Sequence, residues 1–140
     1  MLSMSSETPK LALVIDNTLE VGLAANTAAV LTLSVGAQHP ELIGADLTDG
    51  SGQPHIGITN IPIPILGADS ATITGLVQKL QGKGVELVSF SKIAQSIHSY
   101  DEYASRLKET PGEDIEYSGI AIFGPTKAVN SLVGSLPRLK

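Results

Sequence analysis

The sequence predicts a single α/β domain built around a mixed, partly parallel β-sheet. The chain has 140 residues, a length that suits one domain. Short apolar runs typical of buried strands alternate along it with stretches of helical periodicity. Strands that alternate with helices form βαβ crossovers, which make at least part of the sheet parallel. We assign residues 1–9 to a disordered tail and residues 10–140 to the domain.

The first strand and the first helix follow each other directly. Residues 11–15 read LALVI, a continuous apolar run typical of a central strand that is buried on both faces. A turn over residues 16–18 leads into a helix that ends near Gly36. Because this helix is apolar nearly all round, we expect it to be covered on more than one side. Its expected inward stripe repeats at steps of four and three and consists of Leu19, Leu23, Asn26, Val30 and Leu33.

Between residues 41 and 65 the pattern changes from helical to extended. Residues 49–52 read DGSG, a strong turn signal between two short apolar runs, so we expect a β-hairpin that adds a mixed edge to the sheet. Ile61, Ile63 and Ile65 alternate with two prolines and share one face of an extended segment. Because proline cannot donate to a β-ladder, this segment belongs at a sheet edge or outside the sheet. The isoleucine face either covers the domain's own core or forms a seam between subunits.

The second half of the chain contains clearer helix and strand signals. Asp69 or Ser70 caps one helix, and Ser99 with Glu102 forms a capping box that opens another. The expected elements are, in order, a helix over residues 70–82, a strand over 85–90, a helical turn over 91–97, a helix over 99–108, a strand over 117–123 and a helix from residue 125.

Composition limits the classes of function. Fourteen acidic residues against nine basic ones give a net charge of −5, which argues against nucleic acid as the main partner because phosphate contacts need a basic surface. The absence of cysteine excludes disulfides, a thiol nucleophile and a Cys-based zinc site. Residues 1–9 lack the pattern of a secretory signal, and the longest apolar stretch, residues 23–37, is too short and too polar to span a bilayer. We therefore expect a cytoplasmic protein that does not act in a membrane.

Polar residues that could bind a ligand follow the predicted strands. Asp16 and Asn17 come directly after the first strand, and Lys92 is the one basic residue that the pattern places at the same edge. Open α/β sheets bind ligands at the carboxyl ends of their strands, where helix N-termini also converge. We expect these segments to meet around a hollow that holds a small polar or anionic ligand. An ordinary turn, a buried amide and a solvated lysine are the alternative. The candidate ligand-binding residues are Asp16, Asn17, Gly22, Asn26, Ser91 and Lys92.

The sequence shows no catalytic set and no metal motif. The separations of His39, His55 and His98 match no known metal-binding pattern. The nucleophile elbow, the dinucleotide-binding glycine motif and the phosphate loop are all missing. We therefore expect no cofactor and no metal, and we favour a binding or regulatory module over an enzyme. A hydrolase of esters or amides and a structural or interaction subunit are the two alternatives.

Several segments together resemble a known family. They are the LALVI run, the GLAAN start of the first helix at residues 22–26, the capped second helix, and the GIAIFGP segment at residues 119–125. Over roughly residues 10–139 the chain resembles an uncharacterised bacterial family, the domain of unknown function 2000, within the type II peptidyl-tRNA hydrolase-like fold group. The resemblance implies a three-layer α/β sandwich, with a four- or five-stranded mixed sheet between helices, that often forms a homodimer.

The chain departs from the hydrolases of that fold group where their chemistry lies. Those enzymes open the first helix with Gly-Lys, whereas Leu23 follows Gly22 here and the helix contains no lysine. They carry an Asp-Ala-Gly-x-Thr stretch after a strand where this chain has SFSK at residues 89–92. An apolar group cannot replace a charged or hydrogen-bonding group in catalysis. The resemblance therefore implies the fold and does not imply peptidyl-tRNA hydrolysis.

Overall fold

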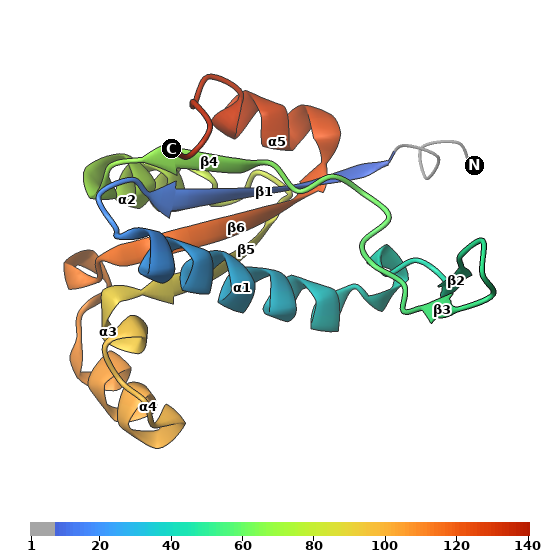
Figure 1. Ribbon diagram of the computed structural model, residues 1–140. Helices are drawn as coiled ribbons and strands as arrows, with labels where there is room; N and C mark the ends of the chain where they lie inside the picture. The colour runs from blue at the N-terminus through green and yellow to red at the C-terminus, as the bar shows by residue number, and fades with distance from the viewer. Residues whose placement is uncertain (1–7) are drawn as a thin grey trace.

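A computed structural model of the protein describes residues 8–140 as a four-stranded sheet with helices on both faces (Figure 1). Of the predicted tail, Pro9 belongs to the first strand, and residues 1–7 lie outside the described residues. The elements in chain order are β1 (Pro9–Asp16), α1 (Val21–Gln38), the 3-10 turn η2 (Pro40–Leu42), β2 (Leu47–Thr48), β3 (Pro54–His55), β4 (Ile65–Ala68), α2 (Ser70–Lys79), β5 (Glu86–Ser91), α3 (Lys92–Gln95), α4 (Tyr100–Glu109), the 3-10 turn η3 (Gly112–Asp114), β6 (Tyr117–Pro125) and α5 (Thr126–Val133).

The strands lie in the order β4-β1-β6-β5, and the sheet is mixed, as the sequence predicts. β1 pairs in parallel with β4, whereas β6 pairs antiparallel with both β1 and β5. It follows that β1, β4 and β5 all run in one direction. Their carboxyl ends, together with the start of β6, form one edge of the sheet, which we call the carboxyl edge.

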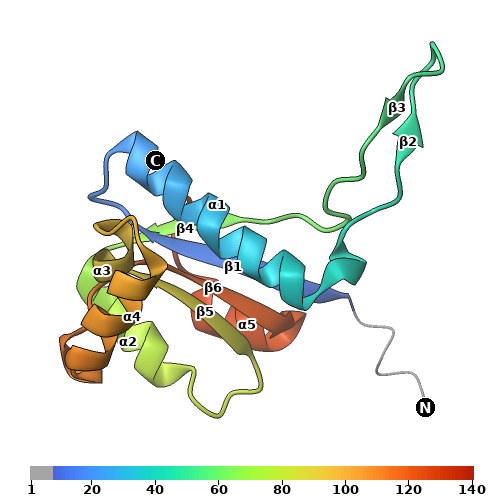
Figure 2. The ribbon, with the colours of Figure 1, turned by 90° about the horizontal axis from the view of Figure 1, so that it is seen from below.

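Alternation along the strands separates two apolar cores. Leu11, Leu13 and Ile15 of β1 pack on the side that α1 covers, whereas Ala12 and Val14 pack with buried residues of α2 and α5 on the other side. Figure 2 shows α1 on one face of the sheet, with α2 and α5 on the opposite face. The described chain is thus a three-layer arrangement of helix, sheet and helices.

The predicted inward stripe of α1 is wrong, although the helix itself is where the sequence places it. The buried residues are Ala24, Thr27, Leu31 and Val35, while Asn26 is exposed. Thr27 sits against Gly119 of β6, where an added Cβ would lie 2.7 Å from Cγ2 of Thr27. This close approach sets the rotation of the helix. Apolar periodicity could not reveal it, because α1 is apolar on every side.

The outward face of α1 stays uncovered in the single chain, against the expectation of cover on more than one side. Val21 is 87% exposed and Leu33 is 77% exposed. By length and composition alone α1 could cross a membrane, but a core helix of a soluble protein passes the same test. Here α1 lies along the sheet and contacts β1, β5 and β6.

The hairpin does not join the edge of the main sheet, which corrects the sequence prediction. β2 and β3 are two residues long each, and they pair antiparallel with each other as a separate sheet. The hairpin projects from the body of the protein in both views (Figures 1 and 2). Its own turn and backbone bonds hold it: the Asp49 carboxylate accepts from the backbone N–H groups of Ser51 and Gln53 at 2.8 and 3.0 Å.

The three isoleucines of the predicted seam lie in different environments. Ile61 is 9% exposed in the core beneath α1, and Ile63 packs against the same core. Ile65, which is 37% exposed, opens the edge strand β4. Both prolines of this segment precede β4, so they lie outside the ladder, as the sequence predicts. Most of the isoleucine face therefore covers the protein's own core.

Two glycine substitutions should have opposite effects on stability, and the first of them tests the contact between α1 and β6. Gly119→Ala should lower the free energy of unfolding by about 1–3 kcal/mol, because its Cβ would overlap Thr27, Ile15 and the Val14 carbonyl oxygen. Gly75→Ala in α2 should raise it by roughly 0.5–1 kcal/mol, because the site is open and alanine favours a helix. Urea unfolding of both variants checks this, and an unchanged Gly119→Ala variant would contradict the close packing of α1.

Candidate functional site

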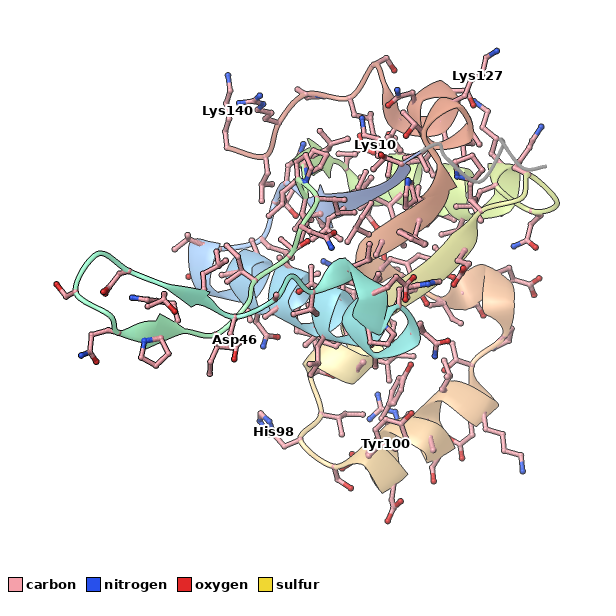
Figure 3. All side chains as sticks on the ribbon, turned by 90° about the vertical axis from the view of Figure 1, so that its right-hand side faces the viewer. Lys10, Asp46, His98, Tyr100, Lys127 and Lys140 are labelled. Carbon is pink, nitrogen blue, oxygen red and sulfur yellow. The ribbon has the colours of Figure 1, made fainter. Side chains whose placement is uncertain are left out.

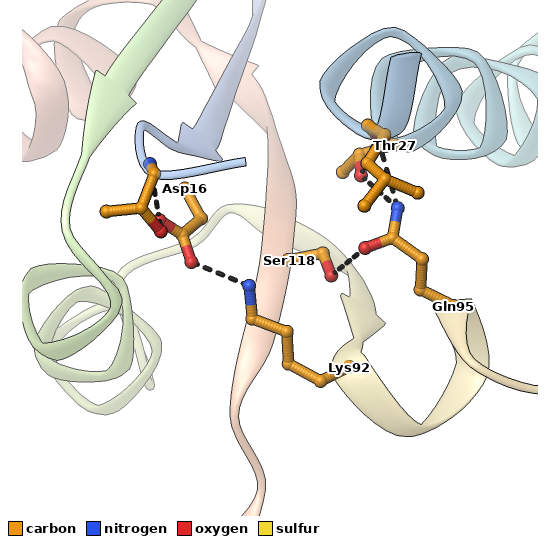
Figure 4. Close-up of polar contacts among 7 residues, drawn as sticks. Asp16, Thr27, Lys92, Gln95 and Ser118 are labelled. Atoms are coloured by element: carbon orange, nitrogen blue, oxygen red, sulfur yellow. Dashed lines mark hydrogen bonds and ion pairs between the residues drawn. The ribbon is translucent and has the colours of Figure 1, made fainter. Parts of the chain in front are cut away.

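The buried polar side chains of the described chain gather at the carboxyl edge. They are Asp16, Thr27, Ser91 and Ser118, which are at most 3% exposed. A buried polar group costs free energy unless it is hydrogen-bonded, and none of the buried side-chain nitrogen and oxygen atoms within residues 8–140 lacks a hydrogen-bond partner. These groups are therefore all hydrogen-bonded: Ser91 caps a helix, and the others form two sets of contacts, around Asp16 and around Gln95, that Figure 4 shows in close-up and that we call the network.

Asp16, the last residue of β1, is the charged centre of this network. Its Oδ1 accepts from the backbone N–H and the hydroxyl of Thr18 at 2.9 and 2.7 Å, and its Oδ2 accepts from Nζ of Lys92 at 2.6 Å. Burial is the largest single effect on the pKa of Asp16, and it raises that pKa. The bonds from Lys92 and Thr18 together outweigh burial and hold the pKa below its ordinary value of 3.8, so the carboxylate stays charged.

Lys92 is held in place by the segment that precedes and begins α3. The hydroxyl of Ser91 accepts from the backbone N–H of Ala94 at 3.1 Å and so caps the helix, while the N–H of Lys92 donates to the Glu116 carbonyl at 2.9 Å. The Lys92 side chain is 34% exposed, whereas that of Asp16 is 3% exposed. A buried carboxylate thus fixes a lysine whose side chain is only partly buried.

Gln95 at the end of α3 forms a second set of bonds between α1 and β6. Its Nε2 donates to Oγ1 of Thr27 at 2.9 Å and to the Leu23 carbonyl at 3.1 Å, and its Oε1 accepts from the Ser118 hydroxyl at 2.7 Å. Both ends of this short helix are therefore anchored. Sequence reasoning missed all three side chains, and the available signals were weak: one threonine in an apolar helix, and a serine near the start of the last strand.

The structure brings only part of the predicted site together. Asp16, Ser91 and Lys92 meet at the carboxyl edge. Asn17 is exposed and joins the edge through its backbone, which donates to the Ala68 carbonyl at 2.9 Å. Gly22 is exposed in the first turn of α1, and Asn26 lies outside the network because its helix is rotated away.

The expected hollow is also displaced. Asp16 and Lys92 contact each other directly at 2.6 Å, and they do not line any of the three prominent hollows found on residues 8–140. One hollow of about 430 Å³ lies beside the same segment of chain and includes Ala94 of α3. Its walls come from α1, β5 and the stretch from α3 to α4, and its lining residues are Val30, Ser34, Ser89, Phe90, Ala94, Ile97, His98, Ser99, Tyr100 and Tyr103. We call it the α3–α4 hollow.

The α3–α4 hollow combines aromatic rings with uncharged polar groups. The rings of Tyr100 and Tyr103 meet edge to face with their centroids 5.7 Å apart, and Tyr100 is 81% exposed. Three serine hydroxyls and the His98 ring add hydrogen-bonding groups, and the lining contains no Asp, Glu, Lys or Arg. Figure 3 shows His98 and Tyr100 on the side of the molecule away from Lys10, Lys127 and Lys140. Such a lining suits a flat, neutral, polar molecule.

The three histidines lie on separate parts of the structure. His39 follows α1, stacks on Phe123 with ring centroids 4.3 Å apart, and contacts Glu86 at 2.9 Å, which raises the pKa of His39 above its ordinary value. His55 lies in β3 and contacts Asp49 at 2.9 Å, while His98 lines the α3–α4 hollow. Within residues 8–140 no three His, Asp or Glu side chains gather in a way that could hold a metal ion.

The Asp16–Lys92 ion pair predicts a pH-dependent loss of stability in Lys92→Met. Because the native pKa of Asp16 is lowered, the pair stabilises the fold above about pH 4, and this contribution disappears as the pH falls through the native pKa. At pH 7 the variant should lose about 1–3 kcal/mol, toward the lower end because Lys92 is partly exposed. Urea unfolding from pH 7 to pH 3 should show this difference shrinking, with Lys83→Met, at an exposed turn, as the control. A difference that does not depend on pH would contradict the assignment.

Comparison with known proteins supports the fold and names the family. A solved structure of a protein of unknown function from Agrobacterium tumefaciens strain C58 is similar over 93% of this chain and 96% of that chain, with a TM-score of 0.85 and 18% sequence identity. At this identity the likeness shows the fold alone. No curated protein matches the chain. The model of one family, described as a protein of unknown function (DUF2000), matches residues 9–140. The chain therefore belongs to the DUF2000 family, whose function is unknown.

Proposed function

We propose that the protein is a small-ligand-binding module and that the α3–α4 hollow is its binding site. The observation that carries this proposal is the lining of the hollow, with aromatic rings and hydroxyl groups around about 430 Å³. Sites for small molecules are concave, mainly apolar and aromatic, and contain a few polar groups that orient the ligand. The volume falls within the roughly 300–1,000 Å³ that such sites occupy.

The polar network at the carboxyl edge acts as the support of this site. Lys92 and Gln95, the first and last residues of α3, bond to Asp16 and Thr27 at 2.6 and 2.9 Å. Because both ends of α3 are tied to buried groups, the wall that α3 contributes is formed before any ligand arrives. A preformed wall lowers the entropy lost on binding. The network thus gives the predicted polar residues a role in positioning the site instead of in contacting the ligand.

The charge of the lining favours a neutral ligand over an anionic one. A charged group in the hollow would lose water without gaining an opposite charge, since the lining residues include no acidic or strongly basic side chain. Lys92 lies two residues before Ala94 of the lining, but its ammonium is already paired with the Asp16 carboxylate and does not supply a positive charge to the hollow. We therefore propose a neutral polar molecule with a ring that packs on Tyr100 and Tyr103.

A binding role fits this site better than catalysis. General acid–base catalysis needs a titratable group that a neighbouring group orients. His98 is the one histidine of the lining, and no carboxylate lies there to orient it. We keep the type II peptidyl-tRNA hydrolase-like grouping as a proposal about fold alone, supported by the order of the elements, and the cytoplasm as the proposed location.

A panel of matched probes tests this proposal. Nucleosides and free sugars serve as neutral probes, and the corresponding nucleotides and sugar phosphates as charged ones. A neutral probe at 100 times its Kd should stabilise the protein by about 2.7 kcal/mol and raise the melting temperature by roughly 10 °C. Saturation-transfer NMR on the same samples should show contacts from the protein to the ring of the probe.

Two variants test whether the probe binds in the α3–α4 hollow. Tyr100→Ala should weaken binding about 3- to 10-fold, because it removes an aromatic contact at an exposed position. Val21→Ala, at an exposed apolar position of α1 outside the hollow, is the matched control and should bind as the wild type does. Preferential binding of the charged probes, no binding of any probe, or equal affinity in Tyr100→Ala would each contradict the proposal.

A further inference from the structure

We propose that the projecting hairpin binds a second copy of this chain. We define the arm as residues 43–60, which contain β2 and β3. In the proposed contact the arm of each copy lies along the outward face of α1 of the other copy. The inference goes beyond ligand binding and is independent of it. The arm does not line the α3–α4 hollow, and the hollow beside α1 into which we place the partner's arm shares no lining residue with it.

The arm exposes apolar side chains that nothing in the described chain covers. Ile56 is 86% exposed, Ile58 is 78% exposed and Leu47 is 71% exposed. An isolated two-stranded hairpin is marginally stable in water, so large apolar side chains left exposed on it favour packing against another molecule. Figure 3 shows the hairpin standing clear of the body, as Figures 1 and 2 do. The arm therefore has the properties of a segment that packs against another molecule.

The arm is nevertheless built in one definite shape. At its root, Gly44 N–H donates to the Ile58 carbonyl at 2.7 Å, and Gly57 N–H donates to the Asp46 carboxylate at 2.9 Å. The two legs approach so closely that a Cβ on Gly57 would lie 1.8 Å from the Gly44 carbonyl oxygen. A rigid arm loses little conformational entropy on binding, which favours a stable complex.

The outward face of α1 is a complementary surface. The 18 residues of α1 contain no charged side chain, and Leu33 near its end is 77% exposed. A hollow of about 530 Å³ runs along the second half of the helix, and its lining residues are Leu11, Ala29, Thr32, Leu33, Val35, Gly36, Ala37, Leu42, Ile43, Thr59 and Ile63. We call this surface the α1 groove. Its lining is apolar apart from Thr32 and Thr59.

The arm and the α1 groove are contiguous, which suits a two-fold arrangement. Ile43 and Thr59, at the root of the arm, also line the groove. A two-fold axis near this root would let each copy insert its arm into the groove of the other in an isologous contact. One leg of the arm, about seven residues long, spans roughly 23 Å, and α1 is about 27 Å long. The arm is thus long enough to follow most of the helix.

The charges favour a second copy over a lipid surface. Residues 11–78, which include α1 and the arm, contain no lysine and no arginine. Glu41, Asp46 and Asp49 on or beside the arm would be repelled by anionic lipids, whereas basic segments bind them. In the proposed dimer the acidic arm meets a helix that contains no charged side chain. Two copies also cover both exposed apolar surfaces at once, which a single unrelated partner need not do.

Light scattering coupled to size exclusion tests the proposal with the full chain. The wild type should have a molar mass near twice 14.5 kDa at micromolar concentrations. Ile56→Glu in the arm and Leu33→Lys in the groove should each reduce the mass to 14.5 kDa. Both positions are exposed, so the monomers should fold normally, as circular dichroism can verify. Tyr100→Glu is the matched control, because Tyr100 is 81% exposed but lies in α4, outside α1, the arm and the groove lining, and it should leave the dimer intact.

Mixing the two single variants gives the sharpest outcome. In a 1:1 mixture the arm of the Ile56→Glu chain meets the groove of the Leu33→Lys chain, so the introduced carboxylate faces the introduced ammonium. The other arm and groove of the pair are both unaltered, so a heterodimer of twice 14.5 kDa should form. A wild type that stays monomeric, a dimer that both variants leave intact, or two monomeric variants that fail to combine would each overturn the proposal. A chain that is monomeric until anionic vesicles are added would assign the arm to a membrane instead.

Discussion

Asp16 and Lys92 join two strands that are not neighbours in the sheet. β6 lies between β1 and β5, yet the carboxylate at the end of β1 and the ammonium after β5 are 2.6 Å apart. A buried carboxylate without a counter-charge would be strongly destabilising, so the position of Asp16 dictates where Lys92 must lie. This requirement fixes the start of α3, and the bonds of Gln95 fix its end. The α3–α4 hollow then follows, because α3 and the chain after it form one of its walls.

α1 contributes residues to three different surfaces of the molecule: the core, the α3–α4 hollow and the α1 groove. Ala24, Thr27, Leu31 and Val35 fill the core, with Thr27 against Gly119. Val30 and Ser34 line the α3–α4 hollow, and Leu33 lines the α1 groove. In the proposed dimer the arm of the second copy covers the remaining, outward face, which accounts for the absence of charged residues from α1. The same property hid its orientation, since a helix that is apolar all round has no periodic signal.

The sequence therefore predicted the elements better than their placement. The order of strands and helices, the caps at Asp69 and Ser99, and the convergence of Asp16 with Lys92 all follow from local patterns and from the rule for carboxyl ends. The separate position of the hairpin does not, because its alternating residues would suit an edge strand equally well. The Gln95 network also escaped prediction, since its hydrogen bonds link residues up to 72 positions apart in the sequence. The α3–α4 hollow could not be predicted either, because its walls come from parts of the chain that are far apart in the sequence.

The most direct test of this account is the pKa of the Asp16 side chain itself. A titration followed by the ¹³C chemical shift of its carboxyl carbon, assigned with Asp16→Asn, measures that pKa without unfolding the protein. The bonds from Lys92 and Thr18 predict a midpoint below the ordinary value of 3.8. A midpoint at or above that value would mean that burial dominates, that Lys92 does not hold the carboxylate, and that α3 is not anchored as described.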